Sequence, residues 1–154
     1  MAKPPVHLRI TWAGGTRFDG GRPGRPSARM DGSGETGPSP VDTLINALAG
    51  CAAVDVVEIL AKRRTPVETL VIEAHAQRAD AIPARVTSAR LDYHITGAGI
   101  DRENAERAIE LAIAKYCSVR NSLNPDIPVE FSLALNGEPG ALKSVELGLS
   151  PSSS

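Results

Sequence analysis

Residues 37–62 read GPSPVDTLINALAGCAAVDVVEILAK and predict one long helix around which the rest of the chain is arranged. Ser39 suits the N-cap of this helix, Pro40 its first position, and Asp42 completes an arrangement like a capping box. Beyond Leu44 the helix is apolar on most of its sides, so we expect it to be buried on most sides. In a chain of 154 residues, such burial requires a sheet on one side and a second helix or a partner subunit on the other.

Strands are expected on both sides of this helix, because apolar and polar residues alternate there with a period of two. We predict them at residues 6–12, 16–18, 28–30, 68–78, 86–96 and 129–135. A second helix is expected from a cap at Asp101 to about Val119, with Cys117 in its last turn. This order of elements indicates an α+β fold in a single domain over 1–137, followed by a flexible tail over 138–154.

The composition excludes several classes of function. Hydrophobic residues make up 42% and charged residues 23% of the chain, as in an ordinary globular protein. Aromatic residues are only 3% and the net charge is −1, so neither a base-stacking platform nor a basic surface for nucleic acid is expected. The first residues lack the apolar core of a signal peptide, and no stretch is judged long enough to span a bilayer. We therefore expect a cytoplasmic protein without nucleic-acid or membrane partners.

Cofactor and metal sites are not expected either. Residues 32–37, GSGETG, formally match a dinucleotide-binding fingerprint, but no hydrophobic strand precedes them and Pro38 and Pro40 follow. We interpret them as a flexible loop. The three histidines and two cysteines have no metal-ligand spacing, and the chain has no GxSxG turn of a nucleophilic hydrolase. His75 and His94 are interpreted as solvent-facing strand residues.

Cys51 and Cys117 are the candidate chemical groups. Cytosolic disulfides are usually transient and serve catalysis or sensing, so a permanent structural bridge is not expected. Cys51 lies among small residues in the long helix, which leaves room for a small ligand near its sulfur. The alternative is that Cys51 is a small hydrophobic core residue, as free cysteines often are.

A reactive thiol needs a nearby cation or helix dipole to stabilise its thiolate. Cys51 is in mid-helix and has no helix N-terminus beside it, so an arginine is the natural activator. Arg17 is our first candidate, with a plain surface role as its alternative. Asp42 precedes Cys51 by nine residues, which places the two about 180° apart on a helix. Asp42 is therefore expected to cap the helix, and to act on the thiol only through Arg17 or across a subunit contact.

Three segments, residues 37–42 (GPSPVD), 49–57 (AGCAAVDVV) and 115–119 (KYCSV), resemble the OsmC/Ohr family in sequence and order. The resemblance extends from about Leu8 to Leu135. It implies an antiparallel sheet wrapped around a long buried helix, an intertwined homodimer with active sites at the subunit interface, and reduction of organic hydroperoxides in the oxidative stress response. It also implies that Cys51 attacks the peroxide, that Cys117 resolves the sulfenic acid as a disulfide, and that an external dithiol reduces it.

One position departs from the family's peroxidases. These proteins have a glutamate after the proline that opens the buried helix, where it pairs with the catalytic arginine, whereas this chain has Val41 followed by Asp42. The DVV and KYCSV segments are similar to the OsmC-like branch of the family. The sequence thus predicts a peroxidase with Cys51, Cys117, Arg17 and Asp42 as catalytic residues and a small hydrophobic peroxide as substrate. The alternative is a non-catalytic dimer that acts as a redox sensor or binds a small ligand.

Overall fold

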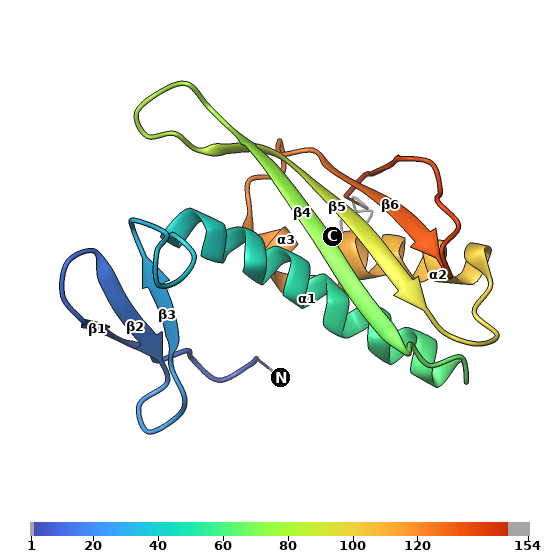
Figure 1. Cartoon of the computed structure of the whole chain (residues 1–154), viewed down its shortest axis with the longest axis horizontal. Coiled ribbons are helices and arrows are strands. Elements are labelled where there is room, and N and C mark those ends of the chain that lie inside the picture. The colour runs from blue at the N-terminus through green and yellow to red at the C-terminus, as the bar shows by residue number, and fades with distance from the viewer. Residues whose placement is uncertain (1, 148–154) are drawn as a thin grey trace. The chain divides into compact units, whose positions relative to one another are not determined.

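The computed structural model describes residues 2–147 and divides the chain into two compact units between Leu44 and Ile45 (Figure 1). The sequence predicts one domain, and the two units are therefore described separately. The elements are β1 (Arg9–Trp12), β2 (Arg17–Gly21), β3 (Ala28–Asp31), α1 (Pro40–Lys62), β4 (Thr69–Arg78), β5 (Val86–Thr96), α2 (Arg102–Leu111), a π-helical segment (Ala112–Tyr116), α3 (Ser118–Ser122), β6 (Val129–Leu135) and β7 (Lys143–Val145).

The first unit is an antiparallel sheet in the order β1-β2-β3. Its first hairpin turns at Gly14 and Gly15, whose φ angles of 95° and 56° lie in the region that glycine adopts without strain. The first strand is shorter than the predicted 6–12. Its side chains are exposed rather than half-buried, Trp12 by 65%, because a three-stranded sheet alone offers no second layer to cover them.

The glycine-rich loop after β3 is organised around the buried carboxylate of Asp31. This carboxylate accepts hydrogen bonds from the hydroxyl of Thr16 and from the backbone N–H and hydroxyl groups of Ser33 and Thr36. These bonds, led by those from Thr16 and Thr36, hold the pKa of Asp31 far below its usual range. The donors of the GSGETG loop therefore bind a carboxylate of the chain itself, in agreement with our rejection of a dinucleotide site.

The second unit contains a four-stranded sheet in the order β4-β5-β6-β7. Strands β4 and β5 form the predicted antiparallel hairpin, and β6 pairs with β5 in parallel. Helix α1 runs across this sheet (Figure 1) and packs one stripe of its surface against it, formed by Leu48, Ala52, Val56 and Leu60. Between sheet and helices, Tyr93 of β5 and Phe131 of β6 pack edge to face with ring centroids 6.5 Å apart.

Helix α1 differs from its prediction in two ways. It is buried on one stripe only, since Val54 and Val57 are 59% and 43% exposed. Its 23 residues also have a mean hydropathy of 1.9, so by length and composition alone it could span a bilayer, contrary to our expectation for every stretch of the chain. The core packing of its buried stripe is what distinguishes it from a lipid-facing helix.

The second predicted helix is interrupted. Asp101 caps α2 as expected and accepts a hydrogen bond of 2.9 Å from the N–H of Asn104. The α-helical hydrogen-bond pattern ends at Leu111, and the N–H of Cys117 donates to the carbonyl of Ala112, five residues earlier, at 2.8 Å. Cys117 then has an extended backbone and precedes α3. It therefore lies between two helical segments, and not in the last turn of one helix.

The segment after Gly137 also departs from the flexible tail that we expected over 138–154. Lys143 and Val145 bound β7, which pairs antiparallel with β6, and Val145 is buried in the core. Val145 supplies the apolar contact that fixes this short strand. Residues 148–154 lie outside the described part of the chain.

Candidate thiol site

Cys117 begins α3 and uses its sulfur as the cap of that helix. The backbone N–H of Arg120 donates a hydrogen bond of 3.3 Å to Cys117 Sγ. On the opposite side, Sγ lies 4.0 Å from the carbonyl oxygen of Leu48 on α1, toward which its S–H is directed. The residue is only 3% exposed. These contacts fix the sulfur between α1 and the start of α3.

Cys51 lies on α1 three residues after Leu48, roughly one helical turn, which brings it to the same region. It is partly exposed and packs against the core cluster to which Cys117 belongs. Both residues are free thiols. The pKa of Cys117 is raised to about 11, mainly by burial and further by hydrogen bonding to Cys51, against the lowering effect of the Arg120 N–H. Cys117 therefore keeps its proton at neutral pH, beside a more accessible second thiol.

Arg120 is a functional candidate that the sequence reasoning missed. Its side chain is 2% exposed and donates to the carbonyl oxygens of Ile127 at 2.8 Å and Asn124 at 3.4 Å. Burial lowers the pKa of its guanidinium, and the charge of Cys117 opposes this shift. The available signal was its place three residues after Cys117, which is a cap spacing once a helix is known to begin there.

Tyr93 is the second such candidate. It is fully buried, on the face of β5 that packs against the helices, and belongs to the same core cluster as Cys117. Burial, and next the charge of Cys117, raise the pKa of its hydroxyl. Among the described residues, that hydroxyl is the buried side-chain polar group without a hydrogen-bond partner. Alternation within β5 identified Tyr93 as a core residue but gave no sign that its hydroxyl would be unpaired.

The remaining predicted site residues belong to residues 1–44. Arg17 is exposed, and its Nε donates to the carbonyl of Gly14 in its own hairpin at 3.3 Å. Asp42 accepts a hydrogen bond from the N–H of Ser39, whose hydroxyl accepts one from the N–H of Asp42, both at 3.1 Å. The predicted capping box is therefore present. The proposed action of Arg17 and Asp42 on Cys51 stays a prediction.

A cavity of about 570 Å³ lies beside Cys117 in the second unit. Its lining is mixed in charge and includes Arg107, Glu110, Lys115 and Asn121 together with Cys117. Arg107 and Glu110 form an exposed ion pair at 3.5 Å. Such a lining suits a polar or zwitterionic molecule that approaches the Cys117 side of the thiol pair better than it suits a purely apolar one.

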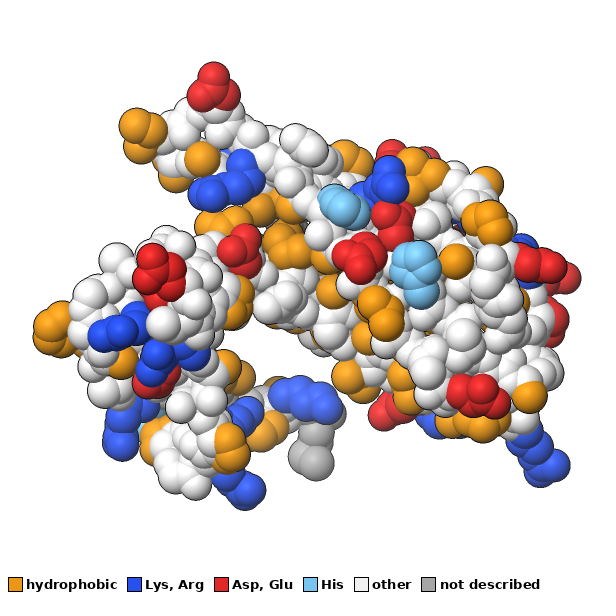
Figure 2. Space-filling model, in the orientation of Figure 1, with side chains coloured by type: hydrophobic (Ala, Val, Ile, Leu, Met, Phe, Trp, Pro, Cys, Tyr) orange, Lys and Arg blue, Asp and Glu red, His pale blue; other side chains and the backbone are white. Residues whose placement is uncertain are grey.

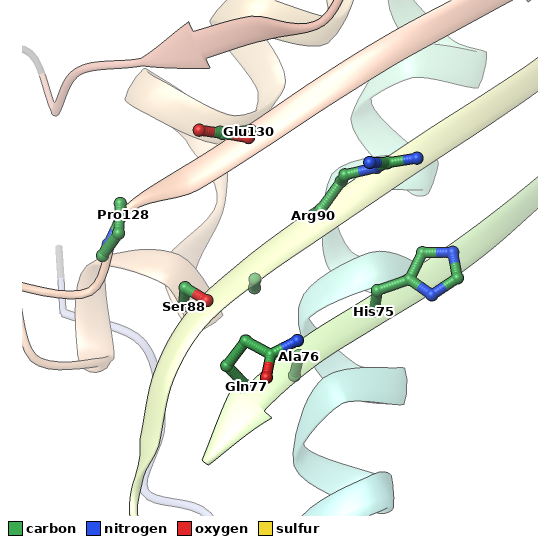
Figure 3. Close-up of a pocket in the computed structure, with 8 residues that line it drawn as sticks. His75, Ala76, Gln77, Ser88, Arg90, Pro128 and Glu130 are labelled. Atoms are coloured by element: carbon green, nitrogen blue, oxygen red, sulfur yellow. The ribbon is translucent and has the colours of Figure 1, made fainter. Parts of the chain in front are cut away.

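A second cavity, of about 430 Å³, lies on the open face of the sheet and is lined by residues of β4, β5 and β6 such as His75, Arg90 and Glu130 (Figure 3). Charged and histidine side chains gather on this face (Figure 2). Asp92 accepts hydrogen bonds from Arg90 at 2.9 Å and Ser132 at 2.7 Å, which, Arg90 first, lower its pKa. No cysteine lines this cavity, so it is separate from the thiol pair. Within residues 2–147, no three His, Cys, Asp or Glu side chains converge as metal ligands would.

Comparison with known proteins gives consistent matches. The family model described as OsmC-like protein matches residues 32–132. Protein YhfA of Escherichia coli strain K12 is 33% identical over 128 residues, which cover 82% of this chain and 96% of that protein. The OsmC-like protein of Mycoplasma pneumoniae has a TM-score of 0.73 at 12% identity, over 87% of this chain and 99% of that structure. The organic hydroperoxide resistance protein OhrB of Bacillus subtilis has a TM-score of 0.57 at 15% identity, over 84% and 98%.

Proposed function

Because the chain belongs to the OsmC-like family, we propose that it reduces organic hydroperoxides with Cys51 and Cys117 as a redox-active pair. The observation that carries the proposal is the arrangement of two free thiols in one core cluster, one partly exposed and one buried. An accessible thiol can meet a substrate, and a buried neighbour can trap the oxidised product. The name of the Bacillus subtilis structure, an organic hydroperoxide resistance protein, supports the choice of substrate class.

The chemistry assigns each sulfur one role. The Cys51 thiolate attacks one oxygen of the hydroperoxide, the O–O bond breaks, and the alcohol leaves after taking a proton, so that Cys51 becomes a sulfenic acid. Cys117 then attacks the Cys51 sulfur, water leaves, and a disulfide forms. An external dithiol returns two electrons to this disulfide and restores both thiols. No resident cofactor enters this cycle.

We also propose that the protein works as a homodimer. Helix α1 exposes Val54 and Val57 along its uncovered side, although its opposite side is fully packed. The first unit exposes Ile10 and Trp12, and strand β4 lies at an edge of its sheet. A second copy of the chain would cover apolar surface of this kind, as the family resemblance implies. The proposed cytoplasmic location is compatible with a thiol pair that cycles.

The function is tested with cumene hydroperoxide as substrate and dithiothreitol as reductant. The native protein should consume the peroxide catalytically, and Cys51→Ser should fall to the uncatalysed rate. Cys117→Ser should still form one equivalent of sulfenic acid per chain, detected by a dimedone adduct in the intact mass, because resolution and not attack is lost. Peroxide consumption by native protein no faster than by Cys51→Ser would refute the enzyme.

The second candidate is a redox sensor or small-ligand binder with the same thiols. Val41 favours it, because the position after the helix-opening proline holds no carboxylate to pair with an arginine. This candidate predicts stoichiometric oxidation of the thiols with negligible turnover. Repeated additions of peroxide with dithiol discriminate the two, since an enzyme removes every addition and a sensor reacts once per chain.

A further inference from the structure

The thiol pair has a buried cation beside it whose charge no carboxylate balances. Arg120 is 2% exposed, yet within residues 2–147 its guanidinium forms no ion pair and binds only the carbonyls of Asn124 and Ile127. An unpaired charge is costly to bury, so a buried cation normally faces an anion. Its own backbone N–H binds Cys117 Sγ. The sulfur of Cys117 is thus an acidic group that could supply the missing negative charge.

A buried hydroxyl in the same cluster has no acceptor. Tyr93 is fully buried and its hydroxyl has no hydrogen-bond partner, although its ring is fixed by edge-to-face packing on Phe131. Such a group costs stability in the resting protein, and it suits a site where charge appears only during a reaction. Since the charge of Cys117 raises the pKa of Tyr93, the hydroxyl stays protonated and retains a proton to donate.

We propose that Arg120 and Tyr93 are positioning residues that stabilise negative charge on Cys117 Sγ when the Cys51–Cys117 disulfide is opened, an inference that rests on the proposed function. The thiolate of the reducing dithiol attacks the more accessible Cys51 sulfur. The S–S bond breaks and its electron pair moves to Cys117 Sγ, which leaves as a thiolate and then takes a proton from solvent. The second thiol of the reductant later releases Cys51 by the same exchange.

This role answers a difficulty in the thiol chemistry. A thiol leaves a disulfide faster when its pKa is low, whereas burial makes Cys117 a weak acid. The Arg120 N–H, the uncompensated guanidinium charge and the Tyr93 hydroxyl are groups that lower the free energy of a buried thiolate. Their effect is specific to the charged sulfur, because a neutral thiol gains little from a nearby cation.

The first test needs no peroxidase activity. In a Cys51→Ser protein, Cys117 is the one remaining cysteine, so labelling with 3-13C cysteine gives a single resonance whose pH titration reports its pKa. Tyr93→Phe should raise this pKa by about one unit, which is a tenfold loss of thiolate at a given pH. Arg120→Gln should raise it in the same direction. Tyr116→Phe, the same change at the exposed tyrosine next to Cys117, should leave it unchanged.

The second test measures disulfide opening directly. The disulfide is formed with diamide, so that no hydroperoxide is needed, and its reduction by dithiothreitol is followed by quenching and mass spectrometry. Tyr93→Phe should slow reduction about tenfold. Equal pKa values and equal reduction rates in native, Tyr93→Phe and Tyr116→Phe proteins would overturn the proposal, even in an active peroxidase. A raised Cys117 pKa in Tyr93→Phe would support it, even if peroxide were not consumed. Tyr93→Phe removes one oxygen atom only, so the test stands if Arg120→Gln folds poorly.

Discussion

Cys117 Sγ accepts a hydrogen bond from the backbone N–H of Arg120 at 3.3 Å, so one sulfur both begins α3 and belongs to the thiol pair. A capping role and a redox role can be separated because they need different atoms. Capping requires any short side chain that accepts a hydrogen bond, whereas disulfide formation requires sulfur.

We predict that Cys117→Ser keeps the stability of the native protein and that Cys117→Ala lowers the free energy of unfolding by about 1 kcal/mol. Serine retains an acceptor at the cap position and alanine does not. Both variants should fail to form the disulfide. Urea titration followed by circular dichroism checks the stability, and equal stability of the two variants would show that the sulfur contact contributes nothing to α3.

Tyr93→Phe should raise the free energy of unfolding by about 1 kcal/mol, since it removes a buried hydroxyl that has no partner in the resting protein. Tyr116→Phe, at an exposed position, should change stability little. Thermal unfolding of the two variants beside the native protein gives the comparison. A less stable Tyr93→Phe would mean that the hydroxyl has a partner in solution, such as ordered water.

The carboxylate of Asp31 gives the first unit a specific pH dependence. Hydrogen bonds from Thr16, Thr36 and Ser33 lower its folded pKa, so its contribution to stability is complete above the unfolded pKa of about 3.8 and is lost as the pH falls through the lower folded pKa. Asp31→Asn should therefore be less stable than native protein at pH 7, and the difference should shrink below about pH 3.8.

Fluorescence of Trp12, the one tryptophan of the chain, reports on this unit directly. Asp80→Asn, at an exposed turn, serves as the control substitution. A difference between native and Asp31→Asn that is constant from pH 7 to pH 2 would contradict the ionised, hydrogen-bonded state of Asp31.

The fold was predictable where local signals agree. Ser39, Pro40 and Asp42 mark the start of α1 correctly, and alternation marks β4, β5 and β6, because these features depend on neighbouring residues alone. The π-helical segment before Cys117 was not predictable, since no glycine or proline marks it and the pattern of apolar residues continues through it. Exposure of Val54 and Val57 was also missed, because periodicity indicates an apolar surface without saying which molecule covers it.

The candidate site follows the same division. Cys51 and Cys117 were identifiable by residue type and by family resemblance. Arg120 and Tyr93 were not, because their significance lies in missing partners: a buried guanidinium without a carboxylate and a buried hydroxyl without an acceptor. Missing partners are visible only when all the neighbours of a group are known.

The two roles considered for Asp42 predict different variants to be impaired. As the third residue of α1, Asp42 binds the N–H of Ser39, so Asp42→Ala and Ser39→Ala should each lower the free energy of unfolding by about 1 kcal/mol. Asp42→Asn keeps an acceptor oxygen and should retain most of the stability. If Asp42 only caps the helix, peroxide consumption by folded Asp42→Asn should match that of native protein. A loss of activity in stable Asp42→Asn would instead assign the carboxylate to the thiol chemistry.

The exposed stripe of α1 predicts how the protein assembles. Val57→Glu should convert a dimer into a monomer, because it places a charge in apolar surface that a partner would have to bury without a counter-ion. Ile82→Glu changes a fully exposed apolar residue in the β4–β5 turn in the same way and should leave the assembly intact. Sedimentation velocity of both variants and the native protein over a range of concentrations distinguishes these cases. Since Val57 faces away from the packed stripe of α1, the monomer should retain its secondary structure, and a native protein that sediments as a monomer at every concentration would refute the dimer.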